Sequence, residues 1–392
     1  MVATKMREIN ENKGGGQAKG KTSFQIEKDT LLDALLFCAK IVPRVASIPL
    51  LSCIKLDIQK DTLFVTAMDV EQSALQFLKI NNVGGVNGSY LLPAKEGIDL
   101  VKKMPAGEIT FNQNDNMVEI TYGSRGKAQL VVLSAEEYPA LPKPADIQFV
   151  ATPIETLRKG ALASRFASTD DKRPTLTAVY IYSDQGQLAF MGTDSHRVYR
   201  HISKVKIDDP ALFHNAMIPA VRFKSIVDSL KSEKVDLAID QQTSHVVLRD
   251  QNVIYFGRML DGTYPELSKF FVKKDEGPAV TVSRGELDDT LNRMLSLDGV
   301  DNNRVTLEVN EDSEFTIHSR SQKGEICEGF PDAKVDEGFP TIKFNARYLK
   351  EALLVGDREV KTATLRVMGV TYPGYIEFDG DQSVCVVVNQ VR

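Results

Sequence analysis

The sequence predicts an α+β protein of three repeated domains, each with two helices packed on antiparallel sheets. Helical and strand-like patterns recur in the same order along the chain, and sequence markers recur at one spacing. The 392 residues are also enough for two to four domains with ample cores.

The first copy opens with an amphipathic helix over 29–40, whose leucines fall on one stripe and which Pro43 ends. Strand-like segments follow at 53–58, 63–67 and 74–80. Pro93 then opens a second helix over 94–104. The apolar faces of both helices are expected to cover a sheet.

The second copy repeats this order. A helix is predicted over 153–168, and strands are predicted at 179–182 and 188–190. The next helix opens at Pro219, with apolar residues from Phe223 to Leu230 at helical spacing.

In the third copy Ser283 can cap a helix over 286–297. A last helix is predicted over 345–354. The strands predicted in this copy are 306–309, 315–318, 364–367, 374–378 and 383–388.

Three sequence markers share one period. The segment 137–141, Glu-Tyr-Pro-Ala-Leu, returns as Thr-Tyr-Pro-Glu-Leu at 263–267, which is 126 positions later. The Leu-Pro-Ala of 92–94 returns as Ile-Pro-Ala, also at a spacing of 126, and Asp69 returns as Asp194 at a spacing of 125. A repeat of this length is a domain rather than a solenoid unit. The predicted divisions are 1–22, a disordered N-terminal tail, and domains 23–146, 147–274 and 275–392.

Composition favours an ordinary soluble globular protein, with 42% hydrophobic and 26% charged residues. No apolar run approaches the roughly 18 residues of a membrane span, and the N-terminus has no signal-peptide core. The scattered Cys38, Cys53, Cys327 and Cys385 form no C-x-x-C, so disulfides, zinc and other cofactors are not expected. We expect a cytoplasmic protein.

Positive and negative charges are distributed unevenly, because the chain has a net charge of −5 and yet its predicted helices carry an excess of lysine and arginine on one face. These faces present Lys95, Lys102, Lys103, Arg158, Lys159, Arg165, Arg222, Lys224, Lys231, Arg347 and Lys350. Lysines and arginines without aromatic stacking groups suit sequence-independent contact with backbone phosphates. The alternative is that they are the solvated faces of amphipathic helices.

A polar stretch, Met-Gly-Thr-Asp-Ser-His-Arg-Val-Tyr-Arg at 191–200, directly follows a predicted strand. It could be a catalytic loop, a metal site or the rim of a peptide pocket. A hydrolase centred on 193–196 is disfavoured, because Ser195 and His196 are neighbours and would point to opposite faces of a strand. The other histidines lack ligand spacing, so we expect no enzyme and no metal.

Several motifs in order resemble one family. They are Ile-Pro-Leu-Leu at 48–51, Leu-Pro-Ala-Lys at 92–95, Glu-Tyr-Pro-Ala-Leu-Pro at 137–142, Arg-Pro-Thr-Leu at 173–176 and Thr-Asp-Ser-His-Arg at 193–197. Over about residues 23–392 the chain resembles the bacterial DNA polymerase III beta subunit, the processivity sliding clamp. The resemblance implies DNA-clamp domains forming half of a closed ring, with two chains encircling duplex DNA head to tail as a homodimer.

The resemblance also implies sites. DNA polymerase, the clamp loader and repair proteins would dock through a short linear motif in a hydrophobic cleft. The residues that map onto this cleft are Leu176, Thr193, Ser195, His196, Arg197, Val198, Pro265, Lys269, Phe270, Val387, Val388, Asn389, Gln390, Val391 and Arg392. Arg44, Lys172 and Arg173 fall where clamps touch DNA.

The chain also departs from the family pattern. Its last residues are Val-Asn-Gln-Val-Arg where the family usually ends in Val-Met-Pro-Met-Arg, so the cleft is expected to be less apolar and to prefer different ligands. Ser195 replaces the usual glycine. The alternative function is a β-rich scaffold that binds protein partners without encircling DNA.

Overall fold

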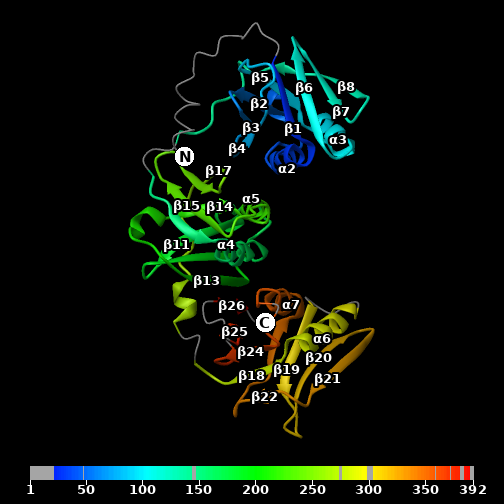
Figure 1. Ribbon diagram of the computed structural model, residues 1–392. Coiled ribbons are helices and arrows are strands. Elements are labelled where there is room, and N and C mark those ends of the chain that lie inside the picture. Colours follow the sequence, from blue (N-terminus) through cyan, green and yellow to red (C-terminus); the bar gives the residue numbers. More distant parts are fainter. Residues whose placement is uncertain are drawn as a thin grey trace. The chain divides into compact units, whose positions relative to one another are not determined.

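The computed structural model describes residues 22–46, 48–143, 147–272, 276–297, 303–357, 359–370, 372–379 and 384–388 (Figure 1). The chain divides into two compact units. The first contains residues up to Ile154 together with Asp228–Met259, and the second contains Glu155–Val227 and the chain from Leu260 onward. The predicted tail, apart from Thr22, and the predicted cleft residues Asn389, Gln390, Val391 and Arg392 lie outside the described residues.

The first unit contains two antiparallel sheets. Four strands are ordered β1-β6-β7-β8 and nine are ordered β10-β15-β16-β17-β4-β3-β2-β5-β9 (Figure 1). The first four are β1 (Ser23–Glu27), β6 (Glu108–Asn114), β7 (Met117–Tyr122) and β8 (Gly126–Val131). The other nine are β2 (Cys53–Gln59), β3 (Thr62–Met68), β4 (Gln72–Lys79), β5 (Gly88–Pro93), β9 (Leu133–Ser134), β10 (Val150–Pro153), β15 (Lys234–Asp240), β16 (His245–Arg249) and β17 (Val253–Arg258). Strand β4 pairs with β17 from Gln72↔Gly257 to Gln76↔Val253, so segments distant in sequence share one sheet.

The second unit repeats this arrangement. Its sheets are ordered β14-β11-β12-β13-β26-β25-β24-β18-β22 and β21-β20-β19-β23. The strands of the nine-stranded sheet are β11 (Ala178–Asp184), β12 (Gln187–Thr193), β13 (Arg197–Lys206), β14 (Ala216–Pro219), β18 (Ala279–Ser283), β22 (Lys334–Val335), β24 (Thr362–Val367), β25 (Gly374–Phe378) and β26 (Val384–Val388). The others are β19 (Arg304–Val309), β20 (Phe315–Ser321), β21 (Gly324–Phe330) and β23 (Ile342–Asn345). Strand β13, which the sequence did not predict, pairs with β12 and β26.

All six predicted helices are present in the described residues. They are α2 (Lys28–Cys38), α3 (Ala94–Lys103), α4 (Ile154–Ala161), α5 (Ala220–Val227), α6 (Arg284–Ser296) and α7 (Ala346–Leu353). Five 3-10 turns accompany them: η1 (Pro49–Ser52), η2 (Leu162–Arg165), η3 (Pro174–Thr177), η4 (Pro210–Phe213) and η5 (Ser268–Phe271). The predicted cap is confirmed, since the Ser283 hydroxyl accepts the Glu286 amide at 3.4 Å. Helix α4 is shorter than predicted, because the chain tightens into η2 from Leu162.

The order of strands confirms the threefold repeat. Each copy contributes two four-stranded runs, and the copies match one another strand for strand. The runs are β1-β6-β7-β8 with β5-β2-β3-β4, then β10-β15-β16-β17 with β14-β11-β12-β13, then β18-β24-β25-β26 with β23-β19-β20-β21. Two pairings, β4 with β17 and β13 with β26, join successive copies. Strands β8 and β21 end their runs at the edges of the two four-stranded sheets. The domain boundaries remain a prediction.

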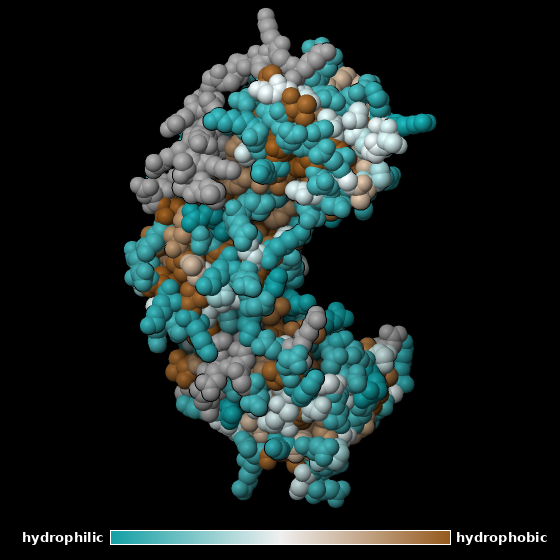
Figure 2. All heavy atoms as spheres, in the orientation of Figure 1, coloured by the Kyte–Doolittle hydropathy of each residue, from teal (hydrophilic) through white to brown (hydrophobic). Residues whose placement is uncertain are grey.

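The surface is mostly hydrophilic on the face seen in Figure 2, with hydrophobic side chains between the polar ones. The apolar side chains with the highest exposed fractions include Val45, Val70, Val221 and Val272, of which Val45 is 89% exposed. None of the described helices combines the length and apolar character that crossing a bilayer requires.

Candidate functional site

The polar stretch at 191–200 consists of the end of β12, a hairpin turn at 194–196 and the start of β13. The Asp194 carboxylate accepts the backbone amides of His196 at 2.9 Å and Arg197 at 3.0 Å. The Thr193 hydroxyl donates to the Arg197 carbonyl at 2.7 Å and accepts the Ser195 amide at 3.1 Å. Such side-chain bonds to nearby backbone fix a turn in one shape. The turn is therefore pre-formed, with Ser195 and His196 exposed at its tip.

The close approach of the chain at Gly192 leaves no room for a side chain. A Cβ atom at this position would lie 2.1 Å from the carbonyl oxygen of Ala163, at η2. Glycine is the residue that allows two backbone segments to approach this closely. This contact fixes β12, and with it the turn, against η2.

Arg197 anchors the turn from behind, and its side chain is only 8% exposed. Its guanidinium donates to Asp194 at 3.0 Å, to the Arg165 carbonyl at 3.1 Å, and to the Glu351 carboxylate on α7. It also lies over the rings of Phe166, at 5.0 Å, and Tyr348, at 4.8 Å. Arg197 thus connects the turn to η2 and α7, and its donors are used within the chain.

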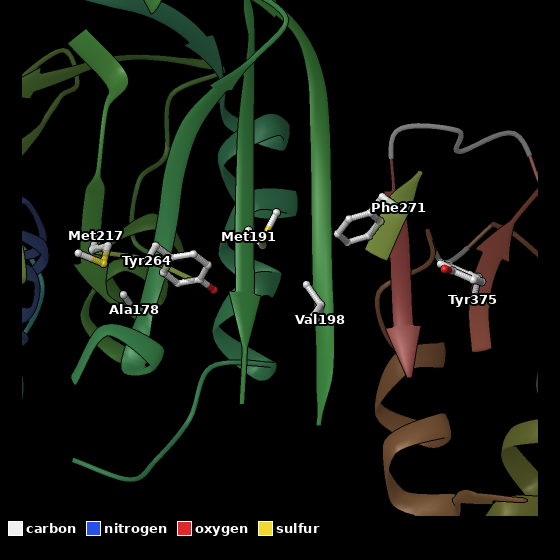
Figure 3. Packing of buried hydrophobic residues seen from close by; sticks show 7 residues of the cluster. All are labelled: Ala178, Met191, Val198, Met217, Tyr264, Phe271 and Tyr375. Carbon is white, nitrogen blue, oxygen red and sulfur yellow. The ribbon is translucent and has the colours of Figure 1, made fainter. Parts of the chain in front are cut away.

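A cluster of buried apolar side chains adjoins this turn on the nine-stranded sheet. We call it the central cluster; its buried members are Ala178, Met191, Val198, Met217, Tyr264, Phe271 and Tyr375. In Figure 3 they lie in a row along the nine-stranded sheet, from Met217 at one end to Tyr375 at the other, and Tyr264 and Phe271 come from outside its strands. The half-buried side chains against it are Tyr180, Tyr182, Leu260, Leu267, Phe270 and Met368. Burial raises the pKa of the Tyr264 phenol.

The structure brings several predicted cleft residues together here. Val198 belongs to the central cluster, and Phe270 packs against it. The Lys269 ammonium nitrogen lies 5.4 Å from the centre of the Phe270 ring. Strand β26 pairs with β13 at Val198↔Val387 and Arg197↔Val388, so the end of the described chain lies beside the turn. Thr193 and Leu176 are buried, whereas Pro265 and Lys269 are exposed.

Sequence reasoning missed several residues of this region. Tyr348 stacks on His196 with ring centres 6.0 Å apart, and Glu351 pairs with Arg197. Tyr180 stacks on both Tyr182 and Tyr264, at 4.9 and 4.6 Å. The sequence repeat could have indicated Tyr264, because it repeats Tyr138, which is buried in a cluster of the first unit. Nothing local to α7 indicates Tyr348 or Glu351.

Ser195 and His196 at the tip of the turn each contact another side chain. The Ser195 hydroxyl accepts a hydrogen bond from Arg173 at 3.0 Å, and the His196 ring stacks on Tyr348. Among the described residues, no three His, Cys, Asp or Glu side chains gather as metal ligands.

The predicted DNA-contacting residues fall into two groups. The exposed side chains are Arg44, Lys95, Lys102, Lys103, Arg158, Arg165, Lys172, Arg173, Lys231 and Arg347. Those of Lys159, Arg222, Lys224 and Lys350 are half-buried. Some have partners within the chain, such as Lys231 with Asp33 at 2.6 Å and Lys159 with Asp357 at 3.0 Å. Exposed pairs of this kind contribute little stability and can exchange for phosphate.

Comparison with known proteins agrees with this fold. The sequence profile of the DNA polymerase III beta subunit, N-terminal domain, matches residues 22–142, and that of its central domain matches residues 154–266. The beta sliding clamp of Staphylococcus aureus is 24% identical over 379 residues, covering 94% of this chain and 99% of that one. The beta sliding clamp of Bacillus subtilis is 28% identical over 386 residues, with the same coverage.

Solved structures agree as well. The crystal structure of the DNA polymerase sliding clamp from Bacillus subtilis matches with a TM-score of 0.84 and 26% identity, covering 95% of this chain and 99% of that chain. The two profile matches together span more than half of the sequence. The chain therefore belongs to the DNA polymerase III beta subunit family, the family of the bacterial sliding clamps.

Proposed function

We propose that two copies of this chain close head to tail around duplex DNA and tether DNA polymerase and other motif-bearing proteins to it. The chain acts by topological linkage and by docking, without a catalytic step of its own. We place this activity in the cytoplasm, where bacterial DNA is replicated.

The observation that carries the proposal is the pair of unmatched edge strands. Inside the chain, the last strand of one four-stranded run pairs antiparallel with the last strand of a run in the next copy, as β4 does with β17 and β13 with β26. Strand β21 corresponds to β4 and β13, and β8 corresponds to β17 and β26. Both β21 and β8 lie at sheet edges. An exposed edge is a template for another strand, so β21 of one chain pairs with β8 of the next.

The basic helix faces supply the contact with DNA. Helix α3 exposes Lys95, Lys102 and Lys103, and α7 exposes Arg347. A closed ring holds DNA by topology, so weak and salt-sensitive phosphate contacts are sufficient and permit sliding. The net charge of −5 is compatible with this arrangement, since only the DNA-facing side needs to be basic.

The central cluster supplies the docking site. Apolar side chains next to a pre-formed polar turn offer pockets for one or two anchor residues and hydrogen-bonding groups that set the peptide's register. The exposed His196 is at the tip of the turn, and the exposed Lys269 lies over the ring of Phe270, which packs against the central cluster. Polymerase, the clamp loader and repair proteins would compete for it.

Closure can be tested by placing charge on the two edges. Val131 at the end of β8 is 55% exposed, and Ile326 on β21 is half-buried in the single chain. We expect light scattering to give a two-chain mass for the unsubstituted protein and a one-chain mass for Val131→Lys with Ile326→Lys. Val370→Lys, at a site 60% exposed and away from both strands, is the matched control and should remain a dimer.

Encirclement is tested on DNA itself. Protein loaded onto a nicked circular duplex should remain bound at high salt and leave when the circle is cut, because a ring slides off a free end. Retention that is unaffected by cutting, or a one-chain mass of the unsubstituted protein, would contradict the ring. A protein that binds docking peptides and never remains on circular DNA would instead be a scaffold.

A further inference from the structure

A second apolar surface in the first unit has the same construction as the central cluster. We call it the N-terminal cluster; its buried members are Leu51, Cys53, Met68, Leu91, Ala135 and Tyr138, with Ala46, Leu50 and Leu141 half-buried against them. Cys53, Leu91 and Tyr138 stand 125 or 126 positions before Ala178, Met217 and Tyr264, which are members of the central cluster. The two surfaces are therefore copies of one element of the repeat.

The turn beside the N-terminal cluster is also copied, down to its hydrogen bonds. The Asp69 carboxylate accepts the amides of Glu71 and Gln72, both at 2.7 Å, as Asp194 accepts those of His196 and Arg197. The Gln72 side chain donates to the Lys40 carbonyl at 3.3 Å, and Arg197 donates to the equivalent Arg165 carbonyl. A pre-formed turn therefore stands next to an apolar surface at both places.

Apolar side chains remain exposed around the N-terminal cluster. Val70 follows Met68 in the turn and is 70% exposed, and Ile48 precedes η1 and is 45% exposed. Val45, beside the packed Ala46, is 89% exposed. A cluster of exposed apolar side chains with a polar rim is typical of an interaction site.

The rims of the two surfaces differ in charge. Glu71, Glu136 and Glu137 are exposed at the N-terminal cluster, at the repeat positions of His196, Gly262 and Thr263 at the central cluster. Exposed lysines, Lys143 and Lys269, stand at equivalent positions of both rims. Arg258 is near Glu71, because its amide donates to the Glu71 carbonyl at 2.8 Å. The central rim in turn has exposed Asp261 and Glu266 where the N-terminal rim has Ala135 and Ala140. Over these positions the N-terminal rim has three carboxylates and its copy has two, and it lacks the histidine of its copy, so it favours a more basic ligand.

We propose that the N-terminal cluster is a second docking surface, for a short peptide with apolar anchors flanked by lysine or arginine. The apolar residues take the anchors and the carboxylates of the rim take the basic flanks. This inference rests on the proposed docking of peptides at the central cluster, since it assigns the same role to its copy. One chain would then hold two peptides of different charge.

The test uses the full chain and two labelled nine-residue peptides. Both contain the same core of two leucines and a phenylalanine, flanked by lysines in one peptide and by glutamates in the other. Titration calorimetry should give two lysine-flanked peptides per chain. Ile48→Lys with Val70→Lys should reduce this number to one, whereas Val83→Lys, at a site 56% exposed on the β4–β5 connection, should leave it at two.

Charge reversal then tests the rim. Glu136→Lys with Glu137→Lys should weaken the lysine-flanked peptide at this surface by about tenfold and strengthen the glutamate-flanked one. Phe270→Ser should remove the other site. A single site that is lost in Phe270→Ser and unaffected by Ile48→Lys with Val70→Lys overturns the second surface and leaves the proposed function standing. A single site with the opposite behaviour upholds the second surface and removes peptide docking from the central cluster.

Discussion

At the scale of single residues, Ser195 holds a backbone conformation that suits glycine. Its φ of 77° lies in the left-handed region, where a side chain is strained by about 1–2 kcal/mol. Ser195→Gly should therefore raise the free energy of unfolding by about 0.5–1 kcal/mol, after the loss of the exposed bond from Arg173. Ser195→Ala removes the same hydroxyl and keeps the strain, so it should stabilise nothing. Urea denaturation distinguishes them, and equal stability of the two variants would contradict the strain.

Glu328 links stability to pH at the residue scale. Arg293 donates to both of its oxygens at 2.6 Å, and this bonding lowers the pKa of the carboxyl below its usual value. Because the pKa is lower in the folded state, the stabilisation is complete above the unfolded pKa of about 4.3 and is lost as pH falls through the folded pKa. When the denaturation midpoint is measured as a function of pH, Glu328→Gln should therefore show a smaller loss of stability on acidification than the unsubstituted protein. Glu325→Gln is the control, because the Arg320 Nε lies 4.0 Å from the Glu325 carboxylate, too far for a hydrogen bond. It should leave the loss of stability at acid pH unchanged.

At the scale of elements, Arg197 holds the turn between β12 and β13 to α7. Replacing it by methionine leaves Asp194 and Glu351 without their shared cation, and should cost about 2–4 kcal/mol. Hydrogen exchange should then accelerate at residues 193–198 and at the last turn of α7, which contains Glu351, and peptide binding should weaken with it. Arg165→Met is the matched control, because only the carbonyl of that residue joins the network. Unchanged exchange in Arg197→Met would show that the turn holds without its anchor.

The elements also differ in how far the sequence predicts them. The helices were predicted because apolar spacing and caps are local, as the Ser283 cap of α6 illustrates. Strand β13 was missed because it contains Arg197, His201 and Ser203, polar residues that are buried in the folded protein. The bond from Arg197 to Glu351 spans 154 positions, and no local pattern encodes it. The stretch at 191–200 was singled out as a polar run after a predicted strand, and its place in a docking cleft came from a resemblance. Its anchoring could be found only in the fold.

At the scale of the whole molecule, the three copies in one chain form two strand junctions between them. One edge strand of the first copy and one of the third copy have no partner strand of this kind within the described residues of the chain. In a dimer of chains these open edges, β8 and β21, form the two remaining junctions. Stability and ring closure are then separable, since each chain already contains both nine-stranded sheets. Substitutions on the edges should change the mass of the assembly and leave the unfolding of the single chain nearly unchanged.

Cys327 offers a direct measure of closure. It is exposed on β21, whereas Cys38 and Cys53 are buried, and burial raises the pKa of Cys38 to about 12. Since the thiolate is the reactive form, maleimide should modify Cys327 far faster than either of these. Pairing of β21 with β8 of a second chain should cover this thiol, so its modification should be slow at high protein concentration and accelerate on dilution. The concentration of half-protection should match that at which light scattering detects dissociation, with Cys327→Ser as the blank. A modification rate that is constant while the mass halves would place the contact between chains somewhere other than on β21.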